Sequence, residues 1–123
     1  MRRTSLILGL MCGAFVATLA QAEARFDGIY RPAGPSMGKW NCIDIGMDGG
    51  ALAIRDDQLF GVENTCDMTA PTNVRDMDAV LFDFECQGEG MTSTDRVMLM
   101  RGDAGSIYVI RDGFVTKWDL CRP

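Results

Sequence analysis

The chain has 123 residues and carries 17 acidic against 12 basic side chains, a net charge of −5. An acidic chain of this length predicts a single domain and argues against nucleic-acid binding, because carboxylates repel phosphates. The sequence contains no histidine. That absence excludes Ser-His-Asp and Cys-His catalytic arrangements and the zinc sites that are built on imidazole.

Residues 1–22 are predicted to be a cleaved secretory signal peptide. Two arginines follow the first methionine, residues 6–19 are apolar and uncharged, and Ala20-Gln21-Ala22 has the small side chains that signal peptidase requires. Cleavage after Ala24 is the alternative. Since the apolar stretch is shorter than the ~20 residues that span a bilayer, we expect no membrane attachment after cleavage. The mature domain, residues 23–123, is then periplasmic or secreted.

Removal of this segment changes both the charge and the cysteine count. Ten basic residues remain against 17 acidic ones, and the resulting net charge of −7 favours cationic partners. Cys12 leaves with the signal, so the mature chain keeps four cysteines. An even number of cysteines in a short exported chain indicates two disulfides. The four are Cys42, Cys66, Cys86 and Cys121.

Turn signals are frequent in the mature chain, and the segments between them are short and rich in β-branched and aromatic residues. Asp56-Asp57 and Asp112-Gly113 are predicted to be tight hairpin turns. The pattern predicts an all-β fold, a small antiparallel barrel or sandwich of about seven short strands. A barrel, which need not be complete, is favoured because closure removes exposed edges. The predicted strands are residues 26–31, 51–55, 58–63, 79–86, 96–101, 106–111 and 114–120.

The disulfide pairing depends on how these strands connect. A simple meander would place Cys86 at the end of the sheet opposite to the other three cysteines, beyond the ~7 Å that a disulfide tolerates between Cα atoms. We therefore expect the chain to cross over within residues 67–78, which form the longest predicted connection. The crossing favours the pairs Cys66–Cys86 and Cys42–Cys121.

No catalytic residue and no cofactor are expected. Ser36-Met37-Gly38-Lys39 matches the S-x-x-K motif, but it lies in a glycine- and proline-rich loop rather than at the start of a helix. Asp83 and Glu85 share one face of a predicted strand and are the candidates for an acid–base pair in a hydrolase. Alternating acids are, however, ordinary on the solvent side of a strand.

Binding residues are expected on the loops. Arg75, Asp76 and Asp78 lie on the long predicted connection, and Glu89 lies in a glycine-rich turn. Binding side chains gather on such loops because the scaffold positions them. Arg75 has a structural alternative, which is to bridge local carboxylates.

Met98 and Met100 are two residues apart on one predicted strand, so their side chains point the same way. Paired thioethers can bind Cu(I), and the two methionines are the candidate metal ligands. The alternative is that they fill irregular space in the apolar packing.

Three stretches resemble a family of small uncharacterised proteins that Gram-negative bacteria export. They are FDGIY at residues 26–30, FGVENTC at 60–66, and NVRDMDA at 73–79 with CQGEG at 86–90. The resemblance covers nearly the whole mature chain, with four cysteines in the same order. It implies that the chain is exported, but it implies no particular activity. The opening FDGIY is also similar to that of small calycin-like barrels, including periplasmic protease inhibitors, with Tyr30 where those proteins have tryptophan.

These observations favour an exported, non-enzymatic binding module for a basic protein or a small envelope ligand. An inhibitor of a basic hydrolase would suit the negative charge. The alternatives are a methionine-based periplasmic copper-binding protein and a structural envelope protein.

Overall fold

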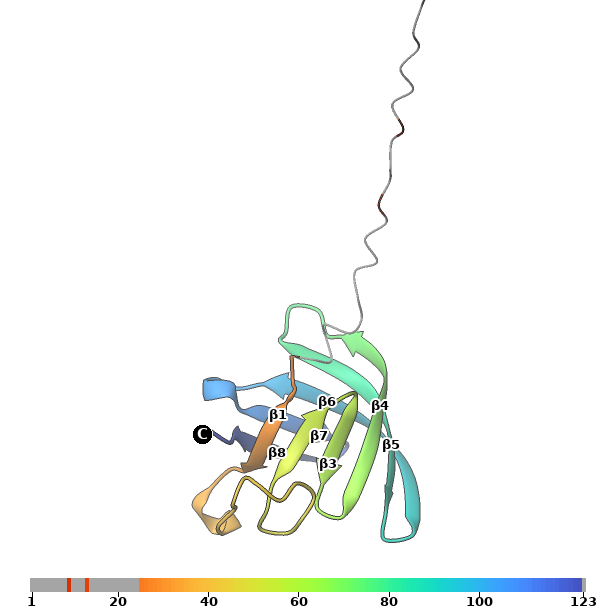
Figure 1. The fold of residues 1–123 in the computed structure, drawn as a ribbon. Helices are drawn as coiled ribbons and strands as arrows, with labels where there is room; N and C mark the ends of the chain where they lie inside the picture. Colours follow the sequence, from red (N-terminus) through yellow and green to blue (C-terminus); the bar gives the residue numbers. More distant parts are fainter. Residues whose placement is uncertain (1–8, 10–12, 14–24, 123) are drawn as a thin grey trace, which may run out of the picture.

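The computed structural model describes Gly9, Gly13 and residues 25–122, and residues 25–122 contain an antiparallel β-barrel (Figure 1). Each strand pairs with the next along the chain, and the last pairs with the first, which closes the barrel. The predicted signal peptide, residues 1–22, lies outside the described residues apart from the two glycines, as do both predicted cleavage sites. In the described part of the chain, no helix has the length and apolar character needed to cross a bilayer.

The elements follow one another as a simple meander. They are β1 (Gly28–Pro32), the 3₁₀ helix η1 (Pro35–Met37), β2 (Leu52–Arg55), β3 (Gln58–Gly61), β4 (Asn64–Asn73), β5 (Ala79–Gly88), β6 (Met91–Arg101), the 3₁₀ turn η2 (Asp103–Gly105), β7 (Ile107–Arg111) and β8 (Phe114–Leu120).

Both predicted hairpin turns are confirmed. Asp56 and Asp57 join β2 to β3 with φ angles of 51° and 59°, as a turn that matches the twist of its strands requires. Asp112-Gly113 joins β7 to β8, and Gly113 has a φ of 91°. Residues with a side chain rarely adopt that backbone conformation, which explains why a glycine occupies this position.

The predicted long connection at residues 67–78 is wrong, because β4 occupies most of it. β4 pairs with β3 and with β5, and its register shifts between Thr69 and Thr72. Ala70 has a φ of 49° at that irregularity, and Pro71 follows it. A bulge accommodates a proline, which has no N–H to donate to a ladder. β4 thus supplies the eighth strand, and no crossover is needed.

Two disulfides are present, with the predicted pairing. Cys66 on β4 lies directly opposite Cys86 on β5, with Cα atoms 3.9 Å apart. These two cysteines are therefore brought together by the strand pairing of the meander, and the crossover predicted from the sequence is absent from residues 25–122. The bond between Cys42 and Cys121 ties the irregular segment after β1 to the end of β8, across a sequence separation of 79 residues.

The interior of the barrel is filled by apolar side chains that alternate along the strands. On β5, Phe82, Phe84 and Cys86 are buried, whereas Asp83 and Glu85 point outward. This is the alternation predicted for residues 79–86. Inward-facing residues of all eight strands contribute to one core cluster.

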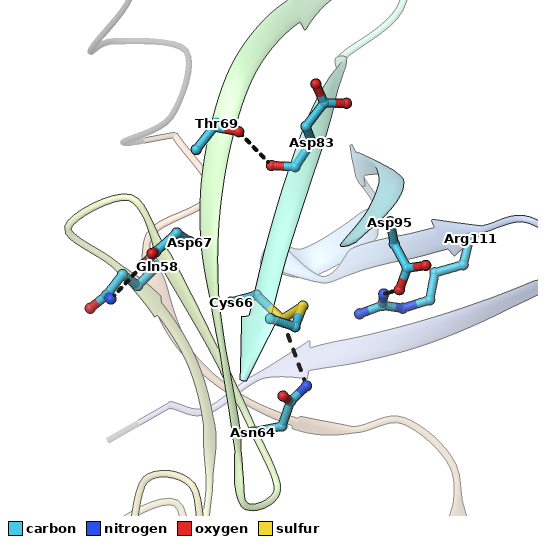
Figure 2. The surroundings of a disulfide bond; sticks show 9 residues. Gln58, Asn64, Cys66, Asp67, Thr69, Asp83, Asp95 and Arg111 are labelled. Carbon is cyan, nitrogen blue, oxygen red and sulfur yellow. Dashed lines mark hydrogen bonds and ion pairs between the residues drawn. A yellow bond between two sulfur atoms is a disulfide. The ribbon is translucent and has the colours of Figure 1, made fainter. Parts of the chain in front are cut away.

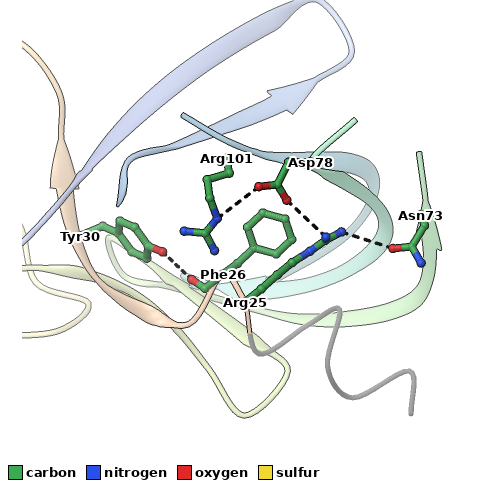
Figure 3. Close-up of polar contacts among 6 residues, drawn as sticks. All are labelled: Arg25, Phe26, Tyr30, Asn73, Asp78 and Arg101. Carbon is green, nitrogen blue, oxygen red and sulfur yellow. Dashed lines mark hydrogen bonds and ion pairs between the residues drawn. The ribbon is translucent and has the colours of Figure 1, made fainter. Parts of the chain in front are cut away.

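The two ends of the barrel differ. At one end, here called the plug end, Phe26 is fully buried and its ring lies edge-on to that of Phe82. Figure 3 shows Arg25 and Arg101 on either side of the Phe26 ring, joined by Asp78 through contacts of 3.3 and 3.6 Å. The opposite end, here called the mouth end, carries the turns β3–β4, β5–β6 and β7–β8.

Candidate functional site

The mouth end is uneven because its hairpins differ in length. β5 and β6 remain paired down to Gly88 and Met91, whereas β7 pairs with β6 only from Met98 onward. Residues 91–97 of β6 therefore have a partner strand on one side and, within residues 25–122, none on the other. This stretch is here called the free edge.

Beside the free edge, side chains that face the barrel interior line an open hollow of about 510 Å³. Alternation from the buried Val97 turns Ser93 and Asp95 inward, and alternation from Trp118 does the same for Phe114. Binding sites are common in the mouths of barrels. The inward-facing residues of the hollow are Asn64, Cys86, Ser93, Asp95, Arg111 and Phe114.

An ion pair spans the hollow. The Asp95 carboxylate lies 3.1 Å from the Arg111 guanidinium, which also lies over the buried Phe84 ring at 5.6 Å. Figure 2 shows this pair across from the Cys66–Cys86 disulfide. Arg111 is thus neutralised and held in place, so the hollow offers an anionic partner no spare positive charge.

The outer face beside the free edge carries a row of directly opposed polar residues, one from each of four neighbouring strands. The row is Gln58, Asp67, Glu85 and Thr94. Gln58 donates a hydrogen bond of 2.8 Å to Asp67, but Asp67 and Glu85 are like charges, which are destabilising when directly opposite. Together with Thr92 and Thr94 they line an outer groove of about 480 Å³, here called the acidic groove. It ends at the free edge.

The mouth end carries more acidic charge than its cations neutralise. The two arginines beside the free edge are already paired, Arg96 with Asp83 at 3.1 Å and Arg111 with Asp95. Besides Asp67 of the acidic groove, four carboxylates at this end have no ion-pair partner among residues 25–122: Glu63, Glu85, Glu89 and Asp112. The surplus charge favours a cationic ligand.

The plug end has its own electrostatic contacts. Burial raises the pKa of Asp27, and repulsion from Asp56 and Asp57 raises it further. On η2 and β8, the hydrogen bond from Lys117 to Asp103, of 2.9 Å, lowers the pKa of the aspartate and raises that of the lysine. The Lys117–Asp103 contact links β8 to η2, and both groups of contacts lie at the plug end, away from the mouth.

The predicted binding residues do not come together. Arg75 and Asp76 are almost fully exposed and lie 3.8 Å apart in the β4–β5 connection, and Asp78 bridges Arg25 and Arg101 in the plug. Glu89 lies beyond the other end of β5. A strand of that length spans roughly 30 Å, so only Glu89 belongs to the mouth end.

The other candidates lie on the outer face. Met98 and Met100 point outward from β6, half-buried, opposite Ile110 and Tyr108 of β7. Apolar neighbours of this kind explain the methionines by packing. Among the described residues no group of three His, Cys, Asp or Glu side chains is placed to hold a metal ion.

The acid–base candidates, Asp83 and Glu85, have different neighbours. Asp83 is ion-paired with Arg96, and Glu85 faces Asp67 instead. The two therefore do not act as a pair across one cleft.

Sequence reasoning missed Ser93, Asp95, Arg111 and Phe114. The signal was the polar run at residues 92–96, which precedes an apolar half-strand. Such a run indicates a strand that extends past its neighbours.

No family model matches this sequence, and no curated protein or solved structure matches it.

Proposed function

We propose that this chain is an exported, non-enzymatic module that binds a basic protein at its mouth end. The resemblance to small exported proteins and the secretory pattern at the start of the sequence support a periplasmic or secreted location. Two disulfides fit an oxidising compartment. A basic hydrolase of the envelope or the surroundings is the partner class that suits the charge, and the module would inhibit it by covering its surface.

One observation carries the proposal: the acidic groove and the four unpaired carboxylates gather at the end where β6 is left with a free edge. Asp67 and Glu85 are kept directly opposite each other although their repulsion costs stability. A bound cation would relieve that repulsion. The same charge disfavours nucleic acid and anionic lipid headgroups.

Calorimetric titration of the oxidised, exported protein tests this. The probes are a basic lysozyme and a short poly-lysine peptide, at about 20 mM and about 300 mM salt. Binding is expected to weaken at the higher salt. Replacing Glu85 and Glu89 by glutamine removes two surface charges of the mouth end and is expected to weaken binding on the order of tenfold.

The matched control neutralises two acids of the plug end, Asp76→Asn in the β4–β5 connection with Asp119→Asn near the end of β8. Asparagine tolerates the positive φ of 61° at Asp76 and has the same shape as the half-buried Asp119, so the fold is retained. Affinity should stay as in the wild type. If the control variant lost as much affinity as the mouth-end variant, binding would depend on net charge alone, and if neither probe bound, the proposal would fail.

A further inference from the structure

The free edge of β6 has backbone groups with no partner. Neighbouring residues of a strand direct their N–H and C=O groups to opposite sides. The N–H of Arg101 donates to Asp78 on the β5 side and that of Gly102 to Ser106 on the β7 side. Because this direction alternates along the strand, the even-numbered residues of β6 direct their backbone groups away from β5, as Gly102 does.

Thr92, Thr94 and Arg96 are the even-numbered residues of the free edge. All three are exposed, β7 reaches only as far as Met98, and no backbone partner for them is found within residues 25–122. Each of these three alternate residues directs an unpaired N–H and an unpaired C=O group to the same edge. Together these groups form a template for an added strand.

The acidic groove leads to this edge. Glu85 lies directly opposite Thr94, whose side chain is short and leaves Glu85 accessible from the open side of β6. An outward side chain on a strand added beside Thr94 would start roughly 10 Å from the backbone of Glu85, two strand spacings away. The long stem of a lysine or arginine can cross a threonine to reach that carboxylate.

We propose that an extended basic segment of the partner adds as a strand to the free edge of β6, with a lysine or arginine opposite Thr94 directed at Glu85. The inference rests on the proposed function and specifies how that site binds. Alternate residues of the added strand face inward, over Phe114 and the Asp95–Arg111 pair. Backbone hydrogen bonds provide the affinity, and the acidic groove selects for positive charge.

Charge decides between a basic partner and a second copy of this chain. Pairing the edges of two copies would bring together two acidic grooves and two sets of unpaired carboxylates, which repel each other. Asp95 also points inward beside the edge, and inward charges discourage unselective pairing of edges.

Two peptides of equal charge separate strand addition from charge attraction. One alternates lysine with threonine, and the other alternates lysine with proline, which has no N–H and cannot form a ladder. The lysine–threonine peptide is expected to bind at least about tenfold more tightly, the equivalent of one or two net hydrogen bonds. Equal affinity for the two peptides would overturn strand addition and leave the proposed function standing, whereas failure of both to bind would refute the proposed function itself.

The variant Thr94→Pro tests the same inference from the side of the protein. It removes an N–H that faces away from β5, so the β5–β6 ladder is retained, and it should abolish the preference for the lysine–threonine peptide. Amide hydrogen exchange provides the second measurement. In the free protein, Thr92, Thr94 and Arg96 should exchange fast while Ser93 and Asp95 are protected, and the peptide should protect the first three. Unchanged exchange at these three residues in the bound protein, or an unaltered preference in Thr94→Pro, would overturn the proposal.

Discussion

Replacing Phe26 by alanine tests whether the residues just before β1 are part of the core. Phe26 is fully buried, its ring lies 6.5 Å from that of Phe82, and both Arg25 and Arg101 approach it within 6 Å of the centroid. Loss of a buried phenylalanine costs about 3–5 kcal/mol. Total stability is about 5–15 kcal/mol for a single domain, so the variant should lose a large share of it and melt more than about 12 °C lower.

Urea unfolding of the oxidised protein, followed by tryptophan fluorescence, measures the loss. Phe114→Ala is the matched control, because Phe114 is 55% exposed at the mouth and its removal should cost less than about 1 kcal/mol. Equal losses for the two variants would refute the conclusion that Phe26 fills the plug end of the barrel as part of its core.

Two further predictions concern a disulfide and a carboxylate. Replacing Cys42 and Cys121 by alanine releases a constraint across 79 residues and should cost ~4.5 kcal/mol by the chain-entropy relation; a loss below ~1 kcal/mol in urea unfolding would contradict that. Asp27 has a raised pKa in the folded state because of burial and the neighbouring acidic turn, so its contribution to stability is present below the ordinary value of 3.8 and is lost as the pH rises through the raised folded value. Asp27→Asn should therefore be more stable than the wild type at neutral pH, with a flatter stability profile on the acid side; lower stability at pH 7 would show the ionised carboxylate to be favourable.

The local parts of the fold were predictable from the sequence. Hairpin turns depend on a few adjacent residues, and Asp112-Gly113 specifies its own turn. The alternation of Phe82 and Phe84 with acids specifies which face of β5 is buried. β4 was missed because Pro71 argues against a strand, and only the neighbouring strands provide the pairing that makes a bulge there acceptable.

The disulfides show that a correct pairing can follow from a wrong topology. The sequence predicts the Cys66–Cys86 pair through a crossover, whereas the structure places the two cysteines opposite each other on β4 and β5 of a meander. The sequence limited the options, since four cysteines allow only three pairings, and the structure supplies the physical reason.

The candidate site could not be predicted from local patterns. A free edge is a property of two strands of unequal length, and neither β6 nor β7 alone indicates where their pairing ends. Likewise, the opposition of Asp67 and Glu85 depends on the register between β4 and β5. Loop position suggested Arg75 and Asp76, but charge that accumulates across several strands becomes visible only when the strands are assembled.

The central claim is that the mouth end binds a cationic partner, and mapping of amide chemical shifts tests it most directly. The isotopically labelled, oxidised protein is titrated with the alternating lysine–threonine peptide at low salt. The account predicts that shifts concentrate on the free edge and the acidic groove, at Thr92, Thr94 and Glu85, and leave Arg75 and Asp76 in the β4–β5 connection unmoved. Shifts centred on that connection, or spread evenly over the acidic surface, would contradict it.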